Sequence, residues 1–71
     1  MVRDEVVTIE GMGQRVTVRG FVGFGGYTDT RLILLLEDGQ VTLEGTGISL
    51  EYLGEGEIVA AGRITTVRFE G

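Results

Sequence analysis

The chain contains no cysteine and no histidine, so it can form neither a disulfide framework nor a zinc site of the usual composition. It also contains no lysine, and its one serine, Ser49, alternates with Ile48 and Leu50 as a solvent-facing strand residue would. The usual proton shuttles and nucleophiles are therefore missing. We expect a non-enzymatic protein with no catalytic residues, no cofactor and no metal.

Positive charge is scarce as well, because six arginines stand against eleven Asp and Glu, which gives a net charge of -5. This balance opposes binding to a nucleic-acid backbone, and nothing in the composition indicates a small-molecule substrate. The longest apolar run, Leu32 to Leu36, is far shorter than the roughly 20 residues that span a bilayer. No apolar stretch typical of a secretion signal precedes the first strand pattern, so we expect a cytoplasmic protein.

The size of the chain limits its core. A sequence of 71 residues predicts a single domain, 1–71, which buries only about 60% of the surface that its unfolded chain exposes. Without disulfides or a metal, oligomerisation is the remaining common reinforcement. We therefore expect a homo-oligomer.

What the chain does contain is a repeat. In rows of 17 residues that begin at Val7, Phe24, Val41 and Ile58, the sequence aligns with itself without gaps. Each row holds two apolar-polar-apolar stretches, and positions one, ten and twelve are apolar in all four rows. Glycine closes most stretches, at Gly11, Gly20, Gly45, Gly54, Gly62 and Gly71. Such a period is typical of units that bury a face by stacking on their neighbours.

The absence of any helical apolar stripe, together with the alternation, predicts an all-β protein. We expect strands at Val6–Glu10, Arg15–Arg19, Arg31–Glu37, Gln40–Glu44, Ile48–Leu53, Glu57–Ala61 and Ile64–Glu70. The segment 21–30 is the hardest to assign. The gap-free repeat favours a short β-solenoid-like stack of four 17-residue coils, and the alternative is an antiparallel β-meander or small barrel.

The dipeptide Asp38-Gly39 favours the meander locally, because Gly can adopt the positive φ of a type I′ hairpin turn. Pairing Leu36 with Val41 would place alternate residues of the preceding strand on one face and Ile33 and Leu35 on the other. That strand is then apolar on both faces. Either both faces are buried in one core, or Ile33 and Leu35 form a contact between subunits.

The ends of the repeat array point to self-association. The first row starts after only six residues, and the last row ends with Val67 and Phe69 close to the end of the sequence. Uncovered strand edges of this kind accept further strands. We therefore expect Val67 and Phe69, with Ile33 and Leu35, to contribute to a self-association interface.

The segment 21–30 is rich in glycine and aromatic residues. Its glycines match neither G-x-G-x-x-G nor the P-loop pattern, so a phosphate site is not indicated. Phe21, Phe24 and Tyr27 have a spacing that could stack bases, but no basic residues accompany them. Because of these aromatic residues, the alternative function is nucleic-acid binding by a small β-barrel module. The negative net charge of the chain disfavours this alternative.

From Val7 onward the sequence contains the segments RLILLLEDGQVTLEGTGISLEYLG and EIVAAGRITTVRFEG. With these segments it resembles the YabP/YqfC sporulation proteins of endospore-forming bacteria. The resemblance implies a structural or scaffolding protein of spore envelope or coat formation, in the mother cell or forespore, associated with a membrane-protein partner. It brings no catalytic residues to this chain.

Overall fold

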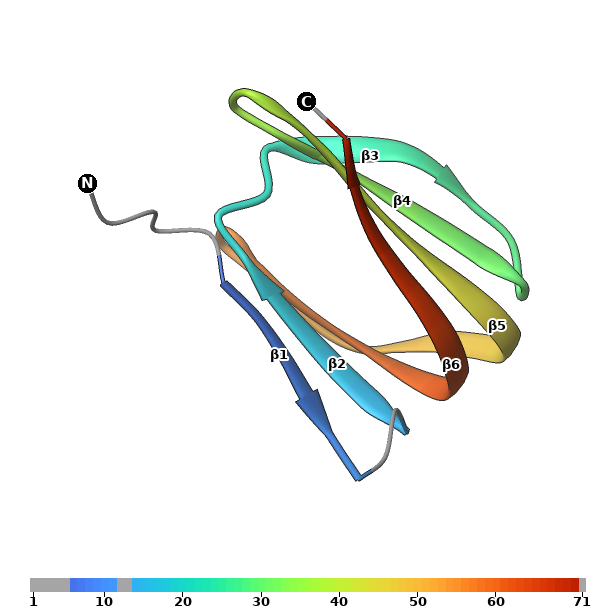
Figure 1. Cartoon of the computed structure of the whole chain (residues 1–71). Helices are drawn as coiled ribbons and strands as arrows, with labels where there is room; N and C mark the ends of the chain where they lie inside the picture. Colours follow the sequence, from blue (N-terminus) through green and yellow to red (C-terminus); the bar gives the residue numbers. More distant parts are fainter. Residues whose placement is uncertain (1–5, 12–13, 71) are drawn as a thin grey trace.

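A computed structural model describes residues 6–11 and 14–70, which form six strands of one antiparallel sheet (Figure 1). The order across the sheet is β1-β2-β6-β5-β4-β3. The strands are β1 (Val6–Glu10), β2 (Arg15–Arg19), β3 (Gly23–Tyr27), β4 (Arg31–Leu36), β5 (Gly39–Gly54) and β6 (Glu57–Glu70). The all-β prediction is confirmed.

The pairing of the strands decides between the two expected architectures. Every neighbouring pair is antiparallel, whereas the coils of a solenoid would pair in parallel. The solenoid expectation was therefore wrong, and the meander alternative is confirmed: β3, β4, β5 and β6 follow one another across the sheet, and the β1-β2 hairpin is added beside β6. β1 and β3, the two ends of the sheet, do not pair with each other, so the sheet is open.

Strands β5 and β6 are long and bent, and they fold the sheet into two facing layers (Figure 1). The first layer contains β1, β2, residues 57–61 of β6 and residues 48–54 of β5. The second layer contains β3, β4, residues 39–44 of β5 and residues 64–70 of β6. The sequence predicted each bent strand as two separate strands, because glycines interrupt the alternation at the bends.

Close backbone contact explains those glycines. A Cβ atom at Gly45 would overlap the backbone carbonyl of Arg63, and one at Gly62 would lie 2.6 Å from the carbonyl oxygen of Gly47. Gly47 and Gly62 also have positive φ, of 64° and 140°, which other residues rarely adopt. Neighbouring strands can therefore bend together only because both lack side chains where they cross.

The hairpin between β4 and β5 differs from its predicted register by two residues. Leu36 pairs with Gly39 and Leu34 with Val41, so the turn residues are Glu37 and Asp38. Gly39 is the first residue of β5 and is not among the described glycines with positive φ. The predicted turn at Asp38-Gly39 was wrong. The face of each side chain was nevertheless right, because a shift of two residues preserves the alternation.

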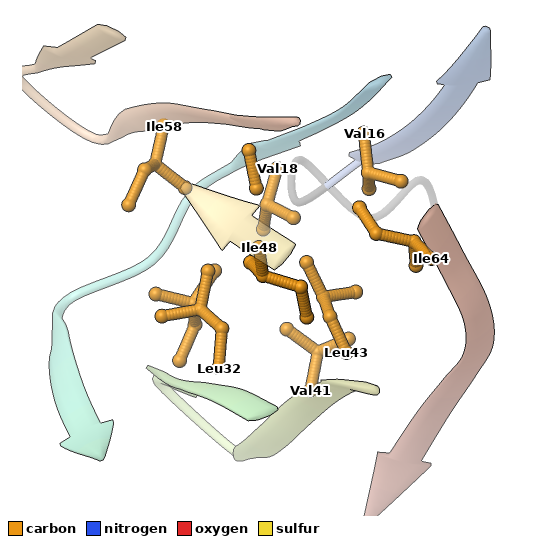
Figure 2. Packing of buried hydrophobic residues seen from close by; sticks show 10 residues of the cluster. Val16, Val18, Leu32, Val41, Leu43, Ile48, Ile58 and Ile64 are labelled. Atoms are coloured by element: carbon orange, nitrogen blue, oxygen red, sulfur yellow. The ribbon is translucent and has the colours of Figure 1, made fainter. Parts of the chain in front are cut away.

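The core consists of four rows of side chains that cross the layers on their inner faces, and Figure 2 shows their buried members pointing toward one another. The second layer contributes the rows Phe24-Leu34-Val41-Phe69 and Tyr27-Leu32-Leu43-Val67. The first layer contributes Val7-Val18-Ile58-Leu53 and Ile9-Val16-Ala60-Leu50. The two middle residues of every row are at most 1% exposed, and each large one stabilises the fold by about 1.5 to 3 kcal/mol.

Candidate functional site

The polar side chains of the described residues form ion pairs at the surface and no group that could hold a metal ion. Nowhere in residues 6–11 and 14–70 do three or more acidic side chains gather as they would around a metal ion. A hollow of about 350 Å³ beside Arg15 is lined partly by Glu10 and Glu51, but Arg15 pairs with both, at 4.0 and 3.1 Å. These opposite charges therefore pair with one another at the surface.

Exposed apolar side chains gather at the two sides where the layers do not close on each other. Each of the four core rows ends at a strand edge, and its terminal residues are more exposed there than its middle residues. We call the two open sides the β1–β6 side and the β3–β5 side. The residues at the row ends are Val7, Ile9, Val67 and Phe69 on the β1–β6 side, and Phe24, Tyr27, Leu50 and Leu53 on the β3–β5 side.

The β3–β5 side is a shallow apolar hollow. Phe24, Tyr27, Leu50 and Leu53 line a volume of about 480 Å³ together with the backbone of Gly25 and Gly26. The hydroxyl of Tyr27 donates a hydrogen bond of 3.0 Å to the carbonyl oxygen of Ile48. This bond ties the edge of β3 to β5 and uses the only hydroxyl in the lining.

The β1–β6 side presents a free strand edge. In the described part of the chain, residues 64–70 of β6 pair with β5 on one side and with no strand on the other. Phe69 is 58% exposed there, although its register partner Val41 is completely buried. Ile9 is 55% exposed on β1, while Val7 and Val67 pack against the core. Unpaired backbone groups and exposed apolar side chains therefore lie together on the β1–β6 side.

The four residues predicted for self-association do not form one patch. Val67 and Phe69 lie on the inner face at the free edge of β6, whereas Ile33 and Leu35 lie on the outer face of β4. A Cβ atom on Gly25 would come within 2.7 Å of Ile33 and 3.2 Å of Leu35. The glycines of β3 thus leave room for these two side chains to lie over the neighbouring strand.

The rest of the outer face of the second layer is charged. Glu44 on β5 forms ion pairs of 3.3 Å with Arg31 on β4 and with Arg68 on β6. Arg68 also lies 3.7 Å from Glu70. The two cross-strand pairs of Glu44 place opposite charges side by side and keep this face hydrated, which leaves the edges as the main apolar surface.

Sequence reasoning missed the hollow on the β3–β5 side. Phe24 occupies the first position of its row, which is apolar throughout, and this was the available signal that it faces inward. The three aromatic residues considered for base stacking are held otherwise: Phe21 and Phe24 form an edge-to-face pair with ring centroids 5.7 Å apart, and Tyr27 bonds to Ile48.

Comparison of the chain with protein-family models, with curated proteins and with solved structures found no match. Among the described residues, none belongs to a helix that could cross a membrane.

Proposed function

We propose that this protein is a non-enzymatic scaffolding protein of endospore formation, which assembles with itself through its open sides. It acts in the cytoplasm of the mother cell or forespore and docks on a membrane-protein partner during assembly of the spore envelope or coat. The observation that supports self-assembly is the exposure of inner-face side chains at the strand edges, above all Phe69 and Leu53.

The physical reason is the cost of leaving these edges in water. A strand edge exposes unpaired N–H and C=O groups, and natural proteins usually cover or charge it. Here the inner-face residues at the edges are large and apolar, and more than half of Phe69, Ile9 and Leu53 is accessible to solvent. Contact with a second copy would bury them and would reinforce the thin core of a short chain.

The role in sporulation has a different support, the resemblance to the YabP/YqfC proteins. The residues behind it, such as Asp38-Gly39 and Ile58 to Ile64, lie at the β4–β5 turn and along the bent part of β6. The structure gives these residues roles in turns, bends and the core. They support a shared fold, and the membrane-protein partner follows from the same resemblance.

The alternative of nucleic-acid binding has less support from the surface. Arg15, Arg31 and Arg68 are each paired with a glutamate and are thus already neutralised. A phosphate backbone would have to displace those carboxylates in a protein with net charge -5. Filter binding of poly-U at low salt should therefore show no tight, salt-sensitive complex.

Size-exclusion chromatography with light scattering, over a hundredfold range of protein concentration, tests the assembly. We expect discrete or growing assemblies whose mass rises with concentration. A strictly monomeric protein across the range would contradict self-assembly.

For the role in sporulation, transcript levels in the sporulating host should rise only after sporulation begins, and constant expression during growth would count against that part of the proposal.

A further inference from the structure

We propose that the assembly is head to tail: the β1–β6 side of one copy docks on the β3–β5 side of the next, so that both layers continue from copy to copy. This inference rests on the self-association proposed above and specifies its geometry. The docked partner is a second copy of this chain, and the contact joins two different surfaces.

Strand directions permit this joining. β6 is antiparallel to β5, β5 to β4 and β4 to β3, so β3 runs antiparallel to β6. By the same reasoning through β6 and β2, β5 runs antiparallel to β1. A second copy in the same orientation therefore brings β3 beside β6 and β5 beside β1 with antiparallel pairing in both layers. The inner faces remain inner faces across the junction.

The core rows also continue across the junction. One row of the second layer begins at Phe24 and ends at Phe69, and the other begins at Tyr27 and ends at Val67. Placing copies side by side brings the exposed Phe69 of one copy to Phe24 of the next, at the hollow of about 480 Å³. Because the Tyr27 hydroxyl is already bonded to Ile48, the lining favours an apolar occupant such as a phenyl ring.

Charge is complementary at the same junction. Arg63 lies at the bend of β6, beyond Val67, and Asp29 lies in the turn after β3, beyond Tyr27. Neither side chain forms an ion pair with another described residue. Since the rows align Tyr27 with Val67, the junction brings Arg63 of one copy and Asp29 of the next to the same end of the contact.

A two-fold contact between two β6 edges would bury Phe69 but would leave the hollow on the β3–β5 side open. The head-to-tail contact covers both open sides and repeats with every added copy. Such heterologous contacts produce a filament, or a ring if the rotation closes. Either product suits a scaffold.

Two variants and their mixture test this geometry. Phe69→Glu places a charge on the β1–β6 side, and Leu53→Glu places one on the β3–β5 side; both residues are more than half exposed, so the fold should persist. We expect each change to weaken self-association at least about thirtyfold, as for a buried aromatic or aliphatic anchor. Each variant keeps one intact side, so an equimolar mixture should form a discrete 1:1 heterodimer. Tyr52→Glu, on the outer face of the same strand as Leu53, is the matched control and should assemble normally.

Each other outcome decides against part of the proposal. If Leu53→Glu still assembles while Phe69→Glu does not, the contact is a two-fold pairing of β6 and the inference is wrong. A mixture of the two variants that stays monomeric also overturns it. Wild-type protein that is monomeric throughout would overturn self-assembly itself, whereas dissociation by Leu35→Arg alone, with an intact β-sheet spectrum, would move the contact to the outer face.

A charge exchange tests the register of the junction. Arg63→Glu and Asp29→Arg should each weaken assembly about tenfold, since each places like charges across the contact. The double variant should recover most of the loss, because the charges are then opposite again. Failure of the double variant to recover would show that these two side chains do not meet.

Discussion

The first and third rows of the repeat contain the same local pattern, Glu-Gly-x-Gly, at residues 10–13 and 44–47, but the chain follows different paths there. After Glu10 it reverses, and β2 returns along β1 as a hairpin. After Glu44 it continues as one bent strand, so that β5 passes from the second layer into the first. The same contrast separates the second row, which reverses between β3 and β4, from the fourth, which bends within β6.

The residue that follows the pattern accounts for the difference. Row one continues with Gln14, which is exposed, and row three continues with Ile48, which is 2% exposed and belongs to the core. The glycines allow either path, since they remove the steric barrier to a turn and to a close crossing. Burial of Ile48 stabilises the bent path. Local sequence thus permits two structures, and tertiary packing selects one.

A substitution at the first glycine of the pattern should show the largest difference in lost stability between the two regions. Gly45→Ala would drive its methyl group into the carbonyl of Arg63, and we expect a loss of about 4 kcal/mol or more. A chain of 71 residues has a total stability of only about 4 to 10 kcal/mol. Urea unfolding followed by circular dichroism should therefore show a largely unfolded variant.

Gly11→Ala is the matched control at the equivalent position of row one. Gly11 has a φ of 60°, and its nearest neighbour is the flexible side chain of Gln14, at 3.0 Å. We expect a loss of about 1 kcal/mol, the strain of a left-handed backbone. Equal effects of the two substitutions would refute the close crossing at the bend. Both must be compared at one chain concentration, because assembly adds to apparent stability.

The second-largest difference in stability is expected for substitutions of the residue that directly follows the pattern. Ile48→Gln gives row three the residue of row one, and it buries an amide without a partner in place of an aliphatic side chain. We expect a loss of about 3 kcal/mol in the free energy of unfolding, measured in urea. The reciprocal change, Gln14→Ile, lies at the surface and should alter stability by less than about 0.5 kcal/mol. A mild effect of Ile48→Gln would show that burial at this position does not select the bend.

These comparisons explain how far the sequence predicts the structure. Alternation identified the strands outside the segment 21–30, where β3 was missed, and the inner face of β4, because both depend on a period of two that neighbours cannot change. It could not distinguish a turn from a bend at Gly11 and Gly45, because the bend depends on the burial of Ile48 in a core that forms only when distant strands meet. The repeat was real, but two of its rows form hairpins and two form bent strands, so a uniform solenoid did not follow.

The candidate site was likewise predictable only where it depends on local sequence. Val67 and Phe69 were predicted to take part in self-association because they lie near the end of the last row, and among the described residues their part of β6 pairs with β5 alone. The opposite hollow depends on Leu50 and Leu53 meeting Phe24 across two layers. No local pattern contains that meeting, since β3 and the second half of β5 come together only through the bend.

The smallest difference in stability is expected for substitutions of the glutamate that begins the pattern. Glu44 lies between Arg31 and Arg68, with 27% of its side chain exposed, while Glu10 is 59% exposed and, among the described residues, pairs with Arg15 alone, at 4.0 Å. We expect Glu44→Gln to cost up to about 1 kcal/mol in unfolding free energy and Glu10→Gln almost nothing, because exposed pairs contribute little. Repeating the urea titration in 1 M salt, where the Debye length falls to about 3 Å, should reduce the difference. A difference that survives high salt would mean that Glu44 stabilises the bend region through hydrogen-bond geometry, such as its contact with Arg68, and not through charge.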